Sequence, residues 1–210
     1  MRYTIFDNMA QCTEQEVQRL LPLVPAFRRE YALRYHHVFG QFCTLQSWLM
    51  LEDLFQQCAN RRNNKCDSTQ QLPSGKQQCA LGAPCYGKHG KPYIPGFPEF
   101  SISHCKTAIA VAVDEEPVGI DIESIRHADD ALLAHTMNEK EIAQIRQAEV
   151  PDRMFTQLWT QKEAYLKCLG TGITDDLPHV LEHADPSRFT LLLRDKYIVS
   201  IYGGTGESPV

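Results

Sequence analysis

Two short apolar runs joined by the turn sequence "DEEP" constrain the fold of this chain more than any other feature. In the first run, "KTAIAVAV" (106–113), bulky residues alternate with alanine, which predicts a β-strand with one large and one small face. The second run, "VGIDIE" (118–123), reads as another strand. Because only a short polar turn separates the runs, we predict an antiparallel β-hairpin over 106–123.

Two carboxylates interrupt the second strand. Side chains alternate across a strand, so Asp121 and Glu123 share one face while Ile120 and Ile122 point into the core. Neighbouring like charges on a half-buried face are costly unless a cation offsets them, and carboxylate oxygens suit a hard ion such as Mg²⁺. Two interpretations are open at this point: a metal site, or an edge strand whose polar face meets solvent or pairs with lysine.

Helical and strand patterns on both sides of this stretch predict a mixed α+β fold. Helices are expected at 14–21, 26–35, 42–59, 127–148 and 153–170, and strands at 188–195 and 196–204. Residues 60–90 are polar and punctuated by Gly and Pro, which predicts a long loop with at most one short strand. Because helices followed by a strand pair occur twice, we predict two similar α+β halves, 1–115 and 116–210.

Composition argues against two classes of function, nucleic-acid binding and membrane insertion. The 26 acidic and 21 basic residues give a net charge of −5, which argues against a nucleic-acid-binding protein. The N-terminus has no basic start followed by an apolar run, and no stretch is long enough to span a bilayer. We therefore expect a cytoplasmic protein with no membrane contact, in which the eight cysteines are reduced thiols rather than disulfides or zinc ligands.

The sequence "LWTQKEAYLK" (158–167) brings a carboxylate and two lysines together on a predicted helix. Glu163 and Lys167 are four residues apart, and Lys162 lies beside them. Such a pair is either an ordinary surface ion pair or a carboxylate and a cation at the edge of a pocket, where Glu163 would act as a ligand or a base.

Groups suited to phosphate binding occur in two other places. "FSISHCK" (100–106) offers Ser103 and His104, and Lys91 lies in the preceding "GKP", a combination typical of phosphate contacts. His104 is equally well explained as a structural histidine. In the first half, Arg28 and Arg29 could bind a phosphate monoester or cover a solvated helix face.

The motifs "GKPYIP", "FSISHC", "VGIDIE" and "LWTQKEAYLKCLGTGI", in this order and at these separations, resemble those of the Sfp-type 4′-phosphopantetheinyl transferases. The resemblance is strong from about residue 88 to 173 and faint elsewhere. Its specific part is the pairing of G-[IV]-D-[IVL]-E with W-x-x-K-E-[AS]-x-x-K about forty residues later.

The resemblance implies an activity and a fold. Members of this family transfer the phosphopantetheine arm of coenzyme A to a serine of an apo acyl or peptidyl carrier protein, require Mg²⁺, and release adenosine 3′,5′-bisphosphate. The family folds as two similar α+β halves related by a pseudo-twofold axis, with coenzyme A in the cleft between them, and the two-halved form is usually monomeric.

The resemblance also implies roles for individual residues. The carboxylates that match the Mg²⁺ ligands of the family are Asp121, Glu123 and Glu163. The residues that match or are candidates for coenzyme A contacts are Lys91, Ser103, His104, Lys162, Lys167, Arg28 and Arg29. We expect Asp121, Glu163 and Lys167 to be catalytic, with Glu163 favoured as the base; Glu141 matches a further family glutamate and is the other candidate.

The chain departs from the family pattern in the first half. Around 26–44 the match is loose, and Gln41 and Phe42 lie where an arginine is expected, so the group that binds the 3′-phosphate stays open. Cys105 replaces a usual serine. Two other functions are compatible with the same motifs: a non-catalytic coenzyme A-binding or nucleotide-binding module, and an Mg²⁺-dependent pyrophosphohydrolase in which water replaces the serine.

Overall fold

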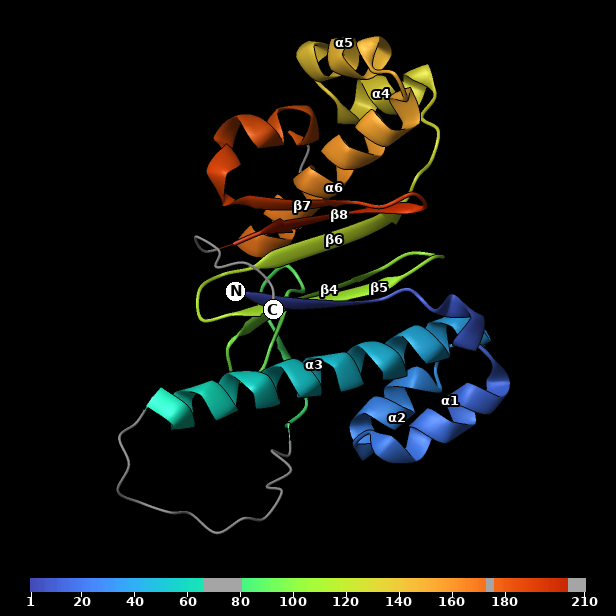
Figure 1. Cartoon of the computed structure of the whole chain (residues 1–210), viewed down its shortest axis with the longest axis vertical. Helices are drawn as coiled ribbons and strands as arrows, with labels where there is room; N and C mark the ends of the chain where they lie inside the picture. The colour runs from blue at the N-terminus through green and yellow to red at the C-terminus, as the bar shows by residue number, and fades with distance from the viewer. Residues whose placement is uncertain (66–80, 173–175, 204–210) are drawn as a thin grey trace.

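The computed structural model of the chain describes residues 1–65, 81–172 and 176–203, and it is a mixed α+β fold (Figure 1). Within these residues, two antiparallel sheets of three strands are layered against each other, and a small third sheet pairs β2 (Cys85–Tyr86) with β3 (Pro92–Tyr93). No helix in the described part of the chain is long and apolar enough to cross a membrane. Within the described residues, Cys12, Cys43, Cys85, Cys105 and Cys168 are free thiols.

The first sheet has the order β1 (Arg2–Phe6), β5 (Ile109–Asp114), β4 (Glu99–His104). The bulky face of β5 packs on α3 (Val38–Lys65), whose buried residues include Leu45, Trp48 and Leu51. Helices α1 (Glu14–Leu20) and α2 (Ala26–Ala32) lie against α3 on the side away from the sheet, joined by the 3₁₀ turn Leu21–Leu23 (Figure 1). The predicted helix at 42–59 is therefore confirmed, and it is longer at both ends.

The second sheet has the order β6 (Gly119–Ser124), β8 (Tyr197–Tyr202), β7 (Phe189–Leu193), which confirms both predicted C-terminal strands. Helix α6 (Pro151–Leu169) covers this sheet. A side chain at Gly119 would place its Cβ 2.0 Å from the backbone oxygen of Ala164, so only glycine allows α6 to lie this close to β6. This contact fixes the position of α6 relative to the two carboxylates of β6.

The predicted hairpin between β5 and β6 is wrong. Both edges of β5 are occupied, by β1 and β4, while β6 pairs with β8 in the other sheet. The alanine face of β5 instead packs on the isoleucine face of β6, in one buried cluster that contains Ala110, Ala112, Ile120 and Ile122. The small side chains of β5 let the second sheet lie directly over it, so the two strands are stacked in layers rather than paired.

The helix predicted at 127–148 is two helices, α4 (Asp130–Thr136) and α5 (Glu139–Gln147). Asn138 starts α5 with a capping box, because its side chain accepts from the N–H of Glu141 and the Glu141 carboxylate accepts from the N–H of Asn138. Short 3₁₀ segments at Met9–Gln11, Leu177–His183 and Pro186–Arg188 complete the described elements.

Part of the predicted loop at 60–90 is helical, because α3 continues to Lys65. The segment 66–80 lies outside the described residues. The division of the chain near residue 115 and the likeness of its two halves stay predictions.

Candidate active site

Strands β4 and β6 lie side by side although they belong to different sheets, and side chains rather than a backbone ladder connect them. The backbone N–H of Ile120 donates to Ser101 Oγ at 3.0 Å. The Ser103 hydroxyl donates to Asp121 Oδ1 at 2.7 Å. This β4–β6 seam brings Ser103, from a motif that precedes β5, onto the acidic face of β6.

Asp121 lies at the centre of the seam and is only 3% exposed. Its Oδ1 accepts hydrogen bonds from Ser103 Oγ and from Lys167 Nζ at 2.5 Å, and Lys167 also donates to Ser103 Oγ at 3.0 Å. The other oxygen, Oδ2, is buried and has no hydrogen-bond partner among the described residues. A buried carboxylate oxygen without a partner is costly, so half of this carboxylate is free to hold a cation.

Two glutamates extend the acidic face. Burial raises the pKa of Glu163, and the charge of Asp121 adds to this effect while Lys167 opposes it. Burial also raises the pKa of Glu123, again together with Asp121, while Arg126, Lys167 and the indole of Trp159 oppose the rise. One oxygen of Glu163, Oε1, is buried without a partner in the described structure.

These features fit a divalent cation. The charge of Asp121 contributes to the raised pKa of both Glu123 and Glu163, and oxygen donors are the ligands that Mg²⁺ prefers. As they stand, no three His, Cys, Asp or Glu side chains in the described residues are close enough together to hold a metal ion, and Lys167 occupies the Oδ1 side of Asp121. The oxygens that a cation bound here would find unused are Asp121 Oδ2 and Glu163 Oε1.

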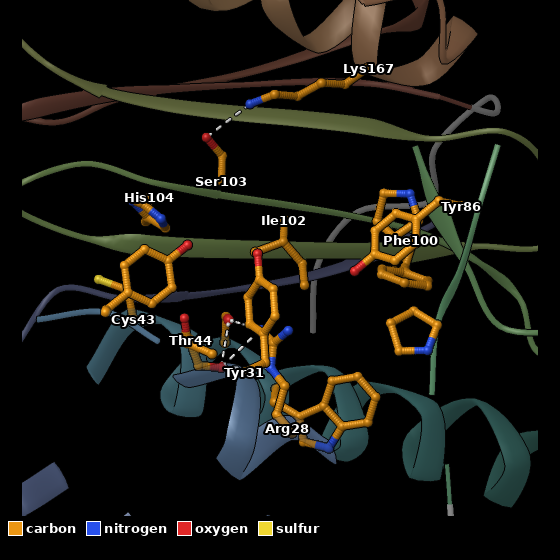
Figure 2. Close-up of a pocket in the computed structure, with 15 residues that line it drawn as sticks. Arg28, Tyr31, Cys43, Thr44, Tyr86, Phe100, Ile102, Ser103, His104 and Lys167 are labelled. Carbon is orange, nitrogen blue, oxygen red and sulfur yellow. Dashed lines mark hydrogen bonds between the residues drawn. The ribbon is translucent and has the colours of Figure 1, made fainter. Parts of the chain in front are cut away.

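A pocket of about 400 Å³ opens beside this network, between α2 and α3 on one side and β4 on the other (Figure 2). In Figure 2, Lys167 and Ser103 approach it from one side and Arg28 from the other. Ser103, His104, Lys167 and Arg28 line it, so the structure gathers four of the predicted residues here. Its aromatic lining is Tyr31, Tyr35, Trp48, Tyr86 and Phe100.

Arg28 and Arg29 differ in their placement. Arg28 lines the pocket, donates to the backbone oxygen of Thr44 at 2.9 and 3.1 Å, and lies 5.3 Å from the ring centre of Trp48. Burial lowers its pKa, yet a guanidinium keeps its charge at neutral pH. Arg29 is exposed on α2 and does not line the pocket.

His104 projects from the end of β4 with its ring edge against Phe39, 5.8 Å between ring centres. Although much of the residue is exposed, partial burial of its ring lowers the pKa of the imidazole, and Lys167 acts in the same direction. A lowered pKa keeps His104 neutral near pH 7, so it can offer one N–H to a phosphate oxygen.

Lys91 and Lys162 are not brought to the pocket. Lys91 Nζ lies 3.0 Å from the backbone oxygen of Cys168 and 3.2 Å from Glu99 Oε2, so it ties β4 to the end of α6. Lys162 is fully buried, and its amine donates to the backbone oxygens of Leu177 and Pro178 and to Glu141 at 2.8 Å. Its three donors are thus all used within the protein, which argues against the predicted cofactor contact.

The sequence analysis missed the aromatic wall of the pocket. Tyr31 and Tyr35 are four residues apart, a spacing that places them on one side of a helix and that was a usable signal. Tyr86 lies on the short strand β2, and nothing in its neighbourhood of the sequence marks it as a pocket residue.

Known proteins match the C-terminal part of the chain and, at lower coverage of their own length, most of the chain. A family model described as the 4′-phosphopantetheinyl transferase superfamily matches residues 117–204, which contain Asp121, Glu123, Glu163 and Lys167. A 4′-phosphopantetheinyl transferase of Bacillus subtilis is 30% identical over 199 residues, covering 92% of this chain and 77% of that protein.

Two other relatives match at different lengths. The 4′-phosphopantetheinyl transferase psf-1 of Bacillus pumilus is 37% identical over 90 residues, covering 41% of this chain and 39% of that protein. The 4′-phosphopantetheinyl transferase Sfp of Bacillus subtilis strain 168 is 24% identical over 166 residues, covering 77% of this chain and 67% of that protein.

Proposed function

Because this chain belongs to the Sfp-type 4′-phosphopantetheinyl transferases, we propose that it transfers the 4′-phosphopantetheine arm of coenzyme A to a serine of an apo acyl or peptidyl carrier protein. The serine oxygen forms a bond to the β-phosphorus of coenzyme A, and the bond from that phosphorus to the bridging oxygen breaks. Adenosine 3′,5′-bisphosphate leaves with the electron pair of the broken bond.

The state of the Asp121 carboxylate is the observation that supports placing this activity at the site described above. Asp121 is buried with one oxygen held by Ser103 and Lys167 and the other unpartnered, at the edge of a pocket large enough for part of a nucleotide. A purely structural buried carboxylate would have both oxygens satisfied.

We propose Asp121, Glu123 and Glu163 as the ligands of Mg²⁺. Bound there with coenzyme A, the ion would neutralise charge on the diphosphate and favour departure of the bisphosphate. The unpartnered Asp121 Oδ2 and Glu163 Oε1 support this assignment, because they are oxygen donors that the protein itself leaves unused.

The proposed phosphate contacts are residues that line the pocket. Lys167 turns from Asp121 toward the diphosphate, where its charge stabilises the developing negative charge on the leaving oxygen. His104 and Ser103 donate hydrogen bonds to phosphate oxygens, and Arg28 supplies positive charge on the opposite wall. Lys91, Lys162 and Arg29 take no part in this proposal, since they lie off the pocket.

Glu163 is the proposed base. It would accept the proton of the carrier serine, and its raised pKa makes the carboxylate a better acceptor. Glu141 does not fit this role, because its carboxylate holds Lys162 at 2.8 Å and the backbone N–H of Asn138 at 2.9 Å.

A carrier-loading assay tests the function. The protein is incubated with coenzyme A, Mg²⁺ and a panel of apo acyl and peptidyl carriers, and intact-mass measurement should show the addition of one phosphopantetheine arm. A carrier with its acceptor serine replaced by alanine, and a reaction with EDTA, are the controls and should show no gain.

The other outcomes separate the alternatives. Binding of coenzyme A with no mass gain on any carrier would favour a non-catalytic module. Breakdown of coenzyme A at a rate that the carrier does not change would favour a pyrophosphohydrolase. Either result would overturn the transferase proposal.

We also propose that the chain is a monomer in the cytoplasm. Size-exclusion chromatography with light scattering at the assay concentration checks the first part, and a mass of twice the chain mass would contradict it. Immunoblotting of the cytosolic and membrane fractions of the native cell checks the second part.

A further inference from the structure

The side chain of Lys91 lies across the C-terminal end of α6. Its amine donates to the backbone oxygen of Cys168 at 3.0 Å and to that of Val118 at 3.4 Å, and it lies 3.2 Å from Glu99 Oε2. Because a lysine ammonium has three donors, these three acceptors can use all of them. The aliphatic stem lies against Gly170, where an added Cβ would be 3.0 Å from Lys91 Cδ.

The bond to Cys168 satisfies a carbonyl at the end of the helix. The last four carbonyl oxygens of an α-helix have no N–H of the same helix to accept from, and this end carries a partial negative charge. The N–H of Gly170 bonds the oxygen of Leu166, and Lys91 supplies a donor and a positive charge for the oxygen of Cys168. Lys91 therefore fixes the last turn of α6, which carries Lys167.

The three partners of Lys91 belong to three different elements. Glu99 is the first residue of β4, Val118 directly precedes β6, and Cys168 lies at the end of α6. Lys91 itself directly precedes β3. One cation, 17% exposed at its side chain, thus joins the starts of two strands from different sheets to the end of the helix that covers the second sheet. We call this set of contacts the Lys91 link.

The same three elements meet again in the network of Asp121. Lys167 of α6 donates to Asp121 of β6 and to Ser103 of β4, and Ser103 also donates to Asp121. The two lysines therefore make two separate links between β4, β6 and α6. In the proposed function, Lys167 turns from Asp121 toward the diphosphate and its link is broken, whereas the Lys91 link uses no group that binds substrate.

We propose that Lys91 is a positioning residue for this active site: by binding β4, β6 and α6 at once, it keeps Asp121 and Lys167 in place relative to each other after their direct bond is broken. This inference rests on the proposed function for the movement of Lys167. In the described structure Lys91 does not line the pocket, so it acts through the elements it binds and is not a catalytic residue.

The first test is a double-mutant cycle that needs no activity. Lys91→Met and Lys167→Met each remove one link, and the double variant removes both. Because both links hold the same three elements, the loss of stability in urea unfolding should be larger in the double variant than the sum of the two single losses. Losses that add, or a double loss smaller than the sum, would mean that the lysines do not share this task and would overturn the inference.

A milder variant covers the case in which the double variant does not fold. Glu99→Gln removes the charged partner of Lys91 and leaves its two backbone acceptors in place. Combined with Lys167→Met, it should show an excess loss of the same sign and of smaller size. An additive result for this pair would count against the inference in the same way.

The second test separates positioning from substrate contact. Lys91→Met should lower kcat for carrier loading by at least about tenfold, since small displacements of reacting groups are costly. The KM for coenzyme A should change by less than about threefold, because no substrate contact is removed. Lys91→Arg restores the charge and the N–H donors, and it should return kcat to within about threefold of the wild type.

Lys88→Met is the matched control, because Lys88 is an exposed lysine three residues earlier in the chain. It should change neither kcat nor KM. A higher KM for Lys91→Met with an unchanged kcat would make Lys91 a substrate contact, and it would overturn the inference.

The outcomes distinguish this inference from the proposed function. If the wild type loads carriers and Lys91→Met has the kcat of the wild type, the inference fails while the function stands. If the wild type loads no carrier but the double-mutant cycle shows the excess loss, the function fails and the role of Lys91 in holding the three elements stands.

Discussion

Helix α6 contributes a lysine to each of two ion pairs with a buried carboxylate, and the pairs differ in how completely their hydrogen bonds are satisfied. Lys162 pairs with Glu141 at 2.8 Å, and Lys167 pairs with Asp121 at 2.5 Å. The two lysines are five residues apart, so they point about 140° away from each other around the helix. One side chain faces α5 and the segment after α6, and the other faces the β4–β6 seam.

The Glu141–Lys162 pair is complete. Lys162 has three acceptors for its three donors, and Glu141 also closes the capping box of α5. The Asp121–Lys167 pair is incomplete, because Asp121 Oδ2 has no partner and the Lys167 side chain is 31% exposed toward the pocket. This comparison indicates that the Glu141–Lys162 pair supports the fold. The Asp121–Lys167 pair keeps an unused oxygen and a partly exposed amine, both of which a ligand could contact.

The largest expected effect tests the complete pair. Lys162→Met leaves the Glu141 carboxylate buried without its cation and should lower the free energy of unfolding by about 3–5 kcal/mol. Lys167→Met also removes the cation of a buried carboxylate, but Asp121 keeps the hydrogen bond from Ser103 and the lysine is partly exposed, so the loss should be smaller, about 1–3 kcal/mol. Urea unfolding of both variants measures the difference, and adding Glu141→Gln to Lys162→Met should recover part of the loss. Equal losses for the two lysines would remove the distinction between the pairs.

The second effect tests the incomplete pair. Asp121→Asn keeps the shape of the side chain and removes the charge, so carrier loading should fall on the order of 10²–10³-fold, the cost of losing one strong electrostatic contact to the transition state. Circular dichroism should show a folded protein. A variant that is fully active, or one that is unfolded at 25 °C, would place Asp121 with Glu141 among the structural carboxylates.

Arg28 and Arg29 are neighbours on α2, but only Arg28 lines the pocket, so substituting each in turn tests the pocket wall. Arg28→Ala removes the hydrogen bonds to Thr44 and the contact with Trp48, so we expect stability to fall by about 1–2 kcal/mol and the KM for coenzyme A to rise. Arg29→Ala is the matched control, because this side chain is exposed, and it should change stability by less than about 0.5 kcal/mol. A larger effect on the KM from Arg29 than from Arg28 would mean that the ligand approaches from outside the pocket.

The smallest expected effect is an increase in the free energy of unfolding, for a substitution of Glu163. Burial raises the pKa of Glu163, so the fold disfavours its ionised form. At pH 7.5 and without metal, Glu163→Gln removes that penalty and should stabilise the protein by about 0.5–1 kcal/mol, a gain typical of replaced active-site groups. Thermal unfolding of both proteins in EDTA measures it. A lower melting temperature for the variant would show that the carboxylate is satisfied in the folded protein.

Much of the secondary structure was predictable from local patterns. The helix at 42–59 and the two C-terminal strands follow from apolar periodicity, and Gly170 ends α6 in the left-handed region with a φ of 67°, as its type predicts. The break between α4 and α5 was also readable, because Asn138 and Glu141 have the spacing of a capping box. The apolar residues keep helical spacing across this break, so the sequence pattern predicted one helix over 127–148 instead of two.

For the site, some of the predicted residues line the pocket and others lie elsewhere in the protein. Ser103, His104 and Lys167 meet at the pocket, whereas Lys162, next in the chain to Glu163, points to a different part of the protein. Neighbouring positions on a helix differ by about 100° in direction, so a sequence motif does not place its members on one face.

The sequence by itself determined the alternation of Asp121 and Glu123 with the isoleucines of β6, and the one-turn spacing of Glu163 and Lys167. These are consequences of local backbone geometry, which the order of residues controls directly. Only the tertiary structure decided that β6 lies beside β4 and pairs with β8, since both strands offer edges that many partners would fit. The alanine face of β5 settled that choice by letting the second sheet pack over it, and this packing carried Asp121 to Ser103.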